Sequence, residues 1–211
     1  MSSQNEKLRW QQASGVLRAM HLEWWMARHS HKTVLALFNL VNSGVSMALL
    51  ATVALVTQEA FIFPSLGATA FIIFHVPMAQ PASPRNTLCG HCIGALVGLG
   101  ALYMFGLQHA DSAFLAGMDL SRVGAVAVAM GLTSCLMVAF NVVHPPAGAT
   151  ALIVALGLMP NISQIPILMA GVLILLMHAF VVNRLAGLRY PVWASAGPRP
   201  KREEPTEPDD V

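Results

Sequence analysis

Hydrophobic residues occur in this chain in long uninterrupted stretches, separated by short polar segments. Four stretches, at about 36–57, 87–107, 122–140 and 165–183, approach the ~20 residues that a helix needs to cross the bilayer core. Two shorter apolar segments that contain proline lie between them, at about 60–77 and 144–159. The order is span, broken segment, span, and it occurs twice. This pattern predicts an all-α membrane protein with four full spans and two broken or re-entrant helices.

A repeated phrase marks the two broken segments. Gly-Ala-Thr-Ala occupies residues 67–70 and again 148–151, 81 residues later, and a proline (Pro64, Pro145) precedes each copy by three positions. Matching interrupted segments in two halves are typical of transporters built from internal repeats, and they indicate where the binding site lies. We therefore expect two three-element repeats, about 36–107 and 120–185, which three crossings each would make inverted relative to one another.

Composition and charge place the chain in a bilayer. Hydrophobic residues make up 55% and charged residues 10%, whereas soluble domains carry about 25% charged residues. Of the 22 charged side chains, 7 lie in residues 1–32 and 10 in residues 184–211. The central residues hold only Glu59, Arg85, Asp111, Asp119 and Arg122. A soluble core would need a charged surface, and a net charge of +2 gives no reason to expect a nucleic-acid partner.

The ends of the chain differ from the middle. Residues 1–35 combine Trp10, Trp24 and Trp25 with lysines and arginines and contain no apolar signal-peptide core, which predicts an amphipathic leader at the headgroup level. Residues 186–211 are rich in proline and charge, which predicts a disordered tail. The transmembrane domain is expected at 36–185.

Positive charge predicts the topology. Lysines and arginines flank both ends of the membrane domain, so both termini should be cytoplasmic and the number of crossings even. With four crossings Arg85 would lie outside and the acidic loop 108–121 inside. Six crossings would place Arg85 inside and the acidic loop outside. The charge rule therefore favours six crossings, and Arg122, which would then lie on the outer side, is the one dissenting residue. We expect a multi-pass protein of the bacterial inner membrane, and whether the broken segments cross or re-enter stays open.

The broken segments suggest an anion site. Proline is tolerated in the first helical turn, so Pro64 and Pro145-Pro146 predict helices that start inside the membrane, one from each side. Two helix N-termini would face one another, and their unpaired N–H groups would offer a site to an anion without a formal cation. Gly67 and Gly148 would allow close backbone approach, and leucine at either position should severely reduce flux while insertion and expression stay near normal. The alternative is that both segments are packed kinks with nothing bound.

Three motifs resemble the HPP family of integral membrane proteins: His-Pro-Pro-Ala-Gly-Ala-Thr at 144–150, Phe-Pro-Ser-Leu-Gly-Ala-Thr-Ala at 63–70, and Ala-Gln-Pro-Ala-Ser-Pro-Arg-Asn at 79–86 followed by Gly90-His91. The resemblance covers roughly 36–185, and it implies an HPP-type transmembrane domain, usually described with four transmembrane helices. Some family members are associated with nitrite transport into plastids and cyanobacterial cells. The resemblance thus implies a nitrite-like anion as substrate.

The candidate substrate-binding residues are Pro64, Ser65, Gly67, Ala68, Thr69, Arg85, Asn86, His91, Asn141, His144, Pro145, Pro146, Gly148, Ala149 and Thr150. Arg85 could gather anions at the inner mouth or extend to headgroups, and Asn86 is a candidate N-cap for the span that follows. We expect His144 to be a neutral donor or cap. His91 could relay a proton or form a buried hydrogen bond, and Asn141 precedes the second break.

Two further functions stay open beside transport of a small monovalent anion. Cys89-Gly90-His91-Cys92 has the spacing of a thiol–disulfide motif, so a membrane redox protein is one alternative, and a non-transporting scaffold subunit is the other. We expect no enzymatic activity, no cofactor and no metal, and a homo-oligomer is left open. Gly90, Gly94 and Gly98 predict a packing stripe, within the chain or in a dimer.

Overall fold

The computed structural model describes residues 21–195; the first 20 residues of the predicted leader and the tail from residue 196 lie outside the described residues. Four helices are long and apolar enough to cross a membrane: α4 (His31–Thr57), α6 (Pro84–Met104), α8 (Leu120–Ala139) and α10 (Gln164–Leu185). Two apolar helices are shorter, α5 (Pro64–His75) and α9 (Pro146–Ala155). Short helical turns complete the fold: α3 (Leu22–Met26), η1 (Gln80–Ala82) and α7 (Ala113–Ala116). Within residues 21–195 there is no strand, and the predicted fold class is confirmed.

The starts of the long helices follow from local chemistry. The Ser83 side chain caps α6 by accepting a hydrogen bond from the Asn86 backbone N–H, and Pro84 fills the first position, where its missing N–H costs nothing. The prediction that Asn86 is the N-cap is therefore wrong, because α6 begins at Pro84 and Ser83 is the residue that caps it. Asp119 caps α8 in the same way, accepting from the Arg122 N–H.

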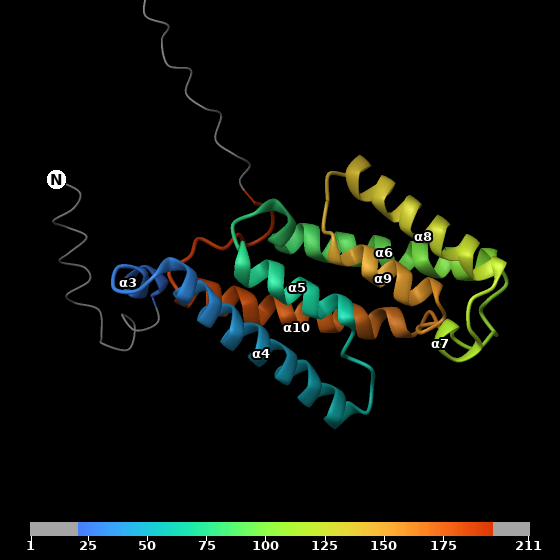
Figure 1. The fold of residues 1–211 in the computed structure, drawn as a ribbon, viewed down its shortest axis with the longest axis horizontal. Coiled ribbons are helices and arrows are strands. Elements are labelled where there is room, and N and C mark those ends of the chain that lie inside the picture. The colour runs from blue at the N-terminus through green and yellow to red at the C-terminus, as the bar shows by residue number, and fades with distance from the viewer. Residues whose placement is uncertain (1–20, 196–211) are drawn as a thin grey trace, which may run out of the picture.

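The two short helices begin inside the bundle. α5 has 12 residues and α9 has 10, which gives rises of about 18 and 15 Å, well short of the ~30 Å hydrocarbon core. Extended backbone at Phe63 precedes α5, and prolines stand at the starts of both helices. The two helices run in opposite directions, and their N-terminal ends meet in the middle of the bundle (Figure 1). Neither half-helix crosses a membrane alone.

The two halves of the chain interlock. α5 packs against α4 of its own half and against α10 of the other half, whereas α9 packs against α8 of its own half and α6 of the other (Figure 1). Each half-helix thus lies between the first span of its own repeat and the last span of the partner repeat. The site between the half-helices therefore depends on both halves.

Glycines allow α6 and α9 to touch. A Cβ at Gly94 would overlap the Ala147 carbonyl oxygen, one at Gly98 would come within 2.6 Å of the Ala151 oxygen, and one at Gly90 within 2.8 Å of the His144 Cβ. The predicted packing stripe thus acts within the chain. Gly67 differs, because apart from its chain neighbours and its own helix backbone no atom of the described residues lies within 4 Å of a Cβ built there. The predicted close backbone approach is therefore not made to another helix at Gly67.

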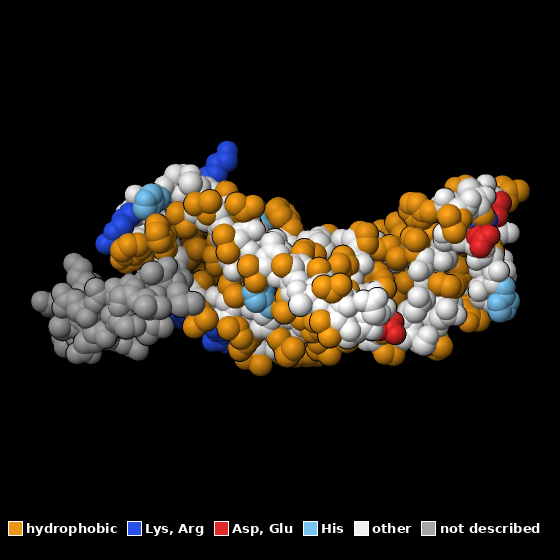
Figure 2. Space-filling view, turned by 90° about the horizontal axis from the view of Figure 1, so that it is seen from below, with side chains coloured by type: hydrophobic (Ala, Val, Ile, Leu, Met, Phe, Trp, Pro, Cys, Tyr) orange, Lys and Arg blue, Asp and Glu red, His pale blue; other side chains and the backbone are white. Residues whose placement is uncertain are grey.

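Charge separates along the bundle. Basic side chains gather at one end and acidic side chains toward the other (Figure 2). At the basic end the Leu22 N–H donates to the Ala186 oxygen, and the Arg85 N–H donates to the Trp193 oxygen at 3.0 Å. Both boundaries of the described chain therefore lie with Arg85 at this end, as a six-crossing plan requires.

Two side chains complete the ends of the bundle. Arg122, the dissenting cation, pairs with Asp119 and donates to the Asp111 oxygen at 2.7 Å, so its charge is compensated locally. At the basic end the buried Tyr190 hydroxyl donates to the Ala82 oxygen at 2.7 Å. Burial raises the pKa of the Tyr190 phenol, which keeps the hydroxyl a donor.

Candidate functional site: a buried histidine and threonine cluster

Four polar side chains meet where the half-helices approach each other. Thr69 comes from α5, His91 from α6, His144 from the turn before α9, and Thr150 from α9. Their exposed fractions are 0%, 0%, 0% and 1%. Buried polar groups are costly unless they are hydrogen-bonded, and all four have partners within the cluster.

The cluster forms a continuous series of hydrogen bonds. Thr150 Oγ1 lies 2.7 Å from His91 Nδ1, and His91 Nε2 lies 2.8 Å from Thr69 Oγ1. Thr69 Oγ1 lies 3.1 Å from His144 Nε2, and His144 Nδ1 lies 2.7 Å from the Pro81 carbonyl oxygen. The two imidazole rings have centroids 5.0 Å apart.

Local sequence positions the two histidines. Two hydrogen bonds fix the backbone around His144. Asn86 Nδ2 donates to the Val143 oxygen at 3.0 Å, and the Ala147 N–H donates to the His144 oxygen at 3.0 Å. His91 follows Gly90, where a side chain would collide with His144. The glycine therefore allows the two rings to approach.

The sequence-predicted residues divide into two sets. The structure brings together Thr69, His91, His144 and Thr150, and Ser65 lies one helical turn before Thr69 on the same face of α5. Pro64 and Ala68 are exposed, and Ala149 and Gly67 are partly exposed. These four residues lie toward the other side of their half-helices.

Arg85 and Asn141 do not reach the cluster. The Arg85 guanidinium donates to the Asn141 and Phe140 oxygens at 3.1 and 3.3 Å, which places it at the C-terminal carbonyls of α8. The Asn141 side chain accepts from Gln80 Nε2 at 3.0 Å and is exposed. In the structure Arg85 therefore caps a helix and Asn141 shapes the turn that follows.

Most of the backbone N–H groups that were predicted to be free at the starts of α5 and α9 are hydrogen-bonded or belong to prolines, which have no N–H. Pro145 and Pro146 have no N–H, and the next two amides, of Ala147 and Gly148, donate to the His144 and Pro145 oxygens at 3.0 Å each. At α5 the Leu66 N–H donates to the Phe63 oxygen at 2.9 Å. The prediction of unpaired amides is thus wrong for α9, because tight turns at its start satisfy them internally. The polar atoms that face the meeting point belong to side chains.

Two groups beside the cluster were not among the candidate residues from the sequence: the Pro81 carbonyl, which bonds to His144, and the Thr87 hydroxyl. Nothing in the sequence marked the Pro81 carbonyl, whose place follows from the turn at η1. Thr87 lies one turn before His91 on α6, and its hydroxyl is buried without a partner in the described residues. The matched threonines of the repeated phrase were the available signal, since Thr69 and Thr150 both bond to histidine.

Comparison with known proteins gives the family. The profile of the HPP transmembrane region matches residues 28–191. The chain belongs to the HPP transmembrane family. Two transmembrane proteins of Dictyostelium discoideum are related to it, one 37% identical over 146 residues (66% of this chain, 47% of the relative) and another 31% identical over 142 residues (64% and 42%). The chain thus spans less than half the length of these relatives. No solved structure gives a significant match.

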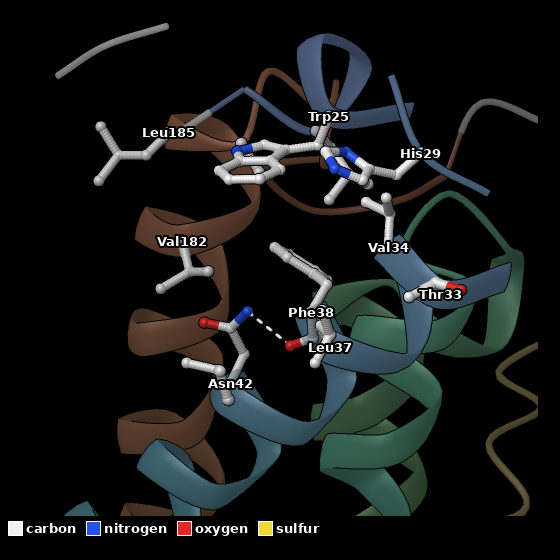
Figure 3. Close-up of a pocket in the computed structure, with 12 residues that line it drawn as sticks. Trp25, His29, Thr33, Val34, Leu37, Phe38, Asn42, Val182 and Leu185 are labelled. Atoms are coloured by element: carbon white, nitrogen blue, oxygen red, sulfur yellow. Dashed lines mark hydrogen bonds between the residues drawn. The ribbon is translucent and has the colours of Figure 1, made fainter. Parts of the chain in front are cut away.

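The HPP chain also has a cavity of about 510 Å³ at its basic end, apart from the cluster. Trp25 and His29 cover it, and Val182 and Leu185 line it from α10 (Figure 3). Most of its lining is apolar, so it does not suit a small anion.

The cysteines of the HPP domain form neither a disulfide nor a metal site within residues 21–195. Cys89 and Cys92 are partly buried, Cys135 is exposed, and all three are free. Among residues 21–195 no group of three or more His, Cys, Asp or Glu side chains could hold a metal ion. Nothing in this arrangement favours the redox alternative.

Proposed function

We propose that this HPP protein transports a small monovalent anion, with nitrite as the first candidate, through the point where α5 and α9 meet. The observation that carries the proposal is the buried cluster of Thr69, His91, His144 and Thr150, to which both halves contribute. Buried ionisable side chains at mid-membrane are costly and mark substrate paths or proton relays. A site at the interface of two repeats is also where transporters bind their substrates.

Two buried hydroxyl groups without a hydrogen-bond partner support a ligand site at the cluster. Ser65 Oγ and Thr87 Oγ1 are buried and have no hydrogen-bond partner among the described residues. Ser65 lies one helical turn from Thr69, and Thr87 lies one turn from His91, so each shares a helix face with a cluster member. A buried polar group without a partner calls for an explanation such as water or an ion. The two hydroxyls would extend the polar line on both sides of the cluster.

The chemistry suits one negative charge. Hydroxyl and imidazole N–H groups donate hydrogen bonds, and the ends of α5 and α9 add partial positive charge, yet no lysine or arginine hydrogen-bonds to the cluster within residues 21–195. Removing an ion from water costs much more when its charge is uncompensated. A singly charged anion such as nitrite is therefore favoured over sulfate or phosphate. The resemblance to nitrite-associated HPP proteins points the same way.

Orientation and setting are part of the proposal. The positive-inside rule would put the basic end, with Arg28, Lys32, Arg85, Arg184 and Arg189, in the cytoplasm. The anion would then pass between the acidic outer end and the basic inner end. We expect the protein to work as a transporter without enzymatic activity.

Uptake into proteoliposomes tests the proposal. Purified protein should take up nitrite faster than protein-free liposomes, with nitrate, formate and chloride compared in the same assay. Thr150→Val should lower the initial rate roughly two- to twelvefold, the equivalent of one hydrogen bond of about 0.5–1.5 kcal/mol.

Thr133→Val is the matched control, because Thr133 is also fully buried but lies on α8 without a partner. Equal rates in wild type and Thr150→Val would exclude the cluster as the site. Rates no higher than in protein-free liposomes for all four anions would refute anion transport.

A further inference from the structure

The hydrogen bonds of the cluster form a chain with one direction. The Pro81 carbonyl can only accept, so His144 Nδ1, 2.7 Å away, must carry the hydrogen. Neutral His144 then accepts at Nε2, and the Thr69 hydroxyl, 3.1 Å away, is the group that can donate to it. Thr69 has only one hydrogen. Its oxygen therefore accepts from His91 Nε2 at 2.8 Å, and His91 Nδ1 accepts from Thr150 at 2.7 Å.

Both imidazoles are neutral in this scheme. Both rings are fully buried, and burial disfavours the charged form of either one. Two imidazolium rings with centroids 5.0 Å apart would in addition repel each other. Charged and titratable groups on the surrounding helices bond elsewhere: Arg85 to carbonyls of α8, Arg122 to Asp119, and His178 to Ser46. No carboxylate among the described residues makes a hydrogen bond to His91 or His144.

Thr69 is a switch in this chain. Its Oγ1 lies 2.9 Å from the Ser65 carbonyl oxygen of its own helix as well as 3.1 Å from His144 Nε2. Its single hydrogen can serve one acceptor at a time. Donation to His144 completes the chain, whereas donation to Ser65 interrupts it in the middle.

We propose that Thr150, His91, Thr69 and His144 form a proton relay, interrupted or completed by rotation of the Thr69 hydroxyl, that couples anion movement to movement of one proton. The relay rests on the proposed anion transport. Its polarity runs from α9 toward the turn at Pro81, which lies at the basic end with Arg85.

Each transfer conserves atoms and charge. A proton that reaches the Thr150 oxygen displaces the hydroxyl proton to His91 Nδ1, and His91 passes its Nε2 proton to Thr69. Thr69 passes its own proton to His144 Nε2, and His144 releases its Nδ1 proton to water at the Pro81 end. One proton enters and one leaves, and only O–H and N–H bonds form and break. The transfer leaves His91 with its hydrogen on Nδ1 and His144 with its hydrogen on Nε2. Before the next transfer each ring must take up a proton at one nitrogen and release one from the other, and water is the partner in both exchanges.

A transport assay tests the coupling. Proteoliposomes that contain a pH dye receive nitrite with and without an acidic exterior, and the gradient-free rate and the protein-free leak are measured in parallel. One pH unit can support at most about a tenfold accumulation ratio of nitrite, inside over outside, for one proton per anion. Wild type should approach this ratio at steady state. Thr69→Val should reduce the ratio to about one, whatever its absolute rate, because valine removes the central hydroxyl. Thr133→Val should keep the wild-type ratio.

Histidine NMR tests the direction of the chain without transport. In nanodiscs with ¹⁵N-histidine, His91 should be the Nε2–H tautomer and His144 the Nδ1–H tautomer, assigned with His91→Gln and His144→Gln. The same tautomer at both residues, or a charged ring at neutral pH, would overturn the relay.

A Thr69→Val protein that keeps gradient-stimulated uptake would also overturn it and leave anion transport standing. Absence of nitrite flux in wild type would instead refute the proposed function, and with it the coupling of nitrite to protons. The histidine tautomers would still show whether the hydrogen-bond chain has the proposed direction.

Discussion

The two threonines of the repeated phrase have unequal partners. Thr69 contacts both histidines, and Thr150 contacts only His91. The position that matches His91 in the second half, 81 residues later, is the buried Val172. The duplication therefore supplies two hydroxyls, but each histidine is unique to one half. One asymmetric cluster forms, with a defined direction.

Glycine at the α6–α9 contact gives a prediction at the same scale. Gly94→Ala should destabilise the protein by about 1–3 kcal/mol, because the new Cβ would overlap the Ala147 carbonyl oxygen, which is backbone and cannot rotate away. Thermal unfolding in detergent measures the change.

Gly67→Ala is the matched control, since a Cβ there meets nothing within 4 Å. It should leave the unfolding midpoint unchanged or raise it slightly, because alanine is favoured over glycine within a helix. Equal losses in the two variants would show that the contact between α6 and α9 is looser than described. The predicted loss of flux in Gly67→Leu stays a prediction.

At the scale of elements, caps decide where each helix begins and ends. Apolar runs located the six membrane segments, but α6 starts at Pro84 instead of near residue 87, and α4 starts at His31 instead of near 36. Polar residues such as Arg85 and Asn86 interrupt the hydrophobic pattern, yet they fit inside α6 because Ser83 caps it and α8 supplies carbonyls to Arg85.

Arg85 supports the end of α8, and this contact can be tested by substitution. Arg85→Gln should loosen the turn between α8 and α9 by about 0.3–1 kcal/mol, the usual contribution of a cation at a helix C-terminus. Hydrogen exchange of the backbone amides at 138–143 should become faster. Arg189→Gln, at an exposed position beyond α10, is the control. Unchanged exchange together with a raised KM for nitrite would instead favour anion capture by Arg85.

At the scale of the whole molecule, the path of the chain agrees with the six-crossing plan that the charge pattern predicts. An extended segment and α5 together return the chain from the end of α4 to the basic end, and α9 does the same in the other direction (Figure 1). The charges follow this plan, with basic groups at one end and acidic groups toward the other (Figure 2). Both features arise only from the complete bundle.

Labelling of single cysteines tests this plan. In a background with Cys89, Cys92 and Cys135 changed to serine, Met78→Cys should react with an impermeant maleimide only from the cytoplasmic side. Glu59→Cys and His109→Cys should react only from the opposite side, because all three positions are exposed and six crossings separate them in this way. Labelling of Glu59→Cys and Met78→Cys from the same side would contradict the plan, because four crossings leave these two positions on one side.

The candidate site was predictable in part. His91, His144 and the two threonines could be found because duplication and intramembrane polarity single them out. The amides at the start of α9 could not be judged, because whether an N–H is free depends on turn geometry that the letters Pro-Pro-Ala-Gly leave open. The sequence makes Arg85 a candidate as a cation at the inner mouth, and Asn141 a candidate because it precedes the second break. The fold instead turns both toward the end of α8.

The sequence by itself determined the bilayer setting, the all-helical class, the two broken segments and their matched threonines. These features depend on hydrophobic length, on proline and on repetition, which are local properties of the chain. Only the tertiary structure decided which polar atoms meet, because the hydrogen-bonded series joins side chains 22 to 75 residues apart. Its direction depends on one backbone oxygen, that of Pro81, whose position results from the packing of both halves.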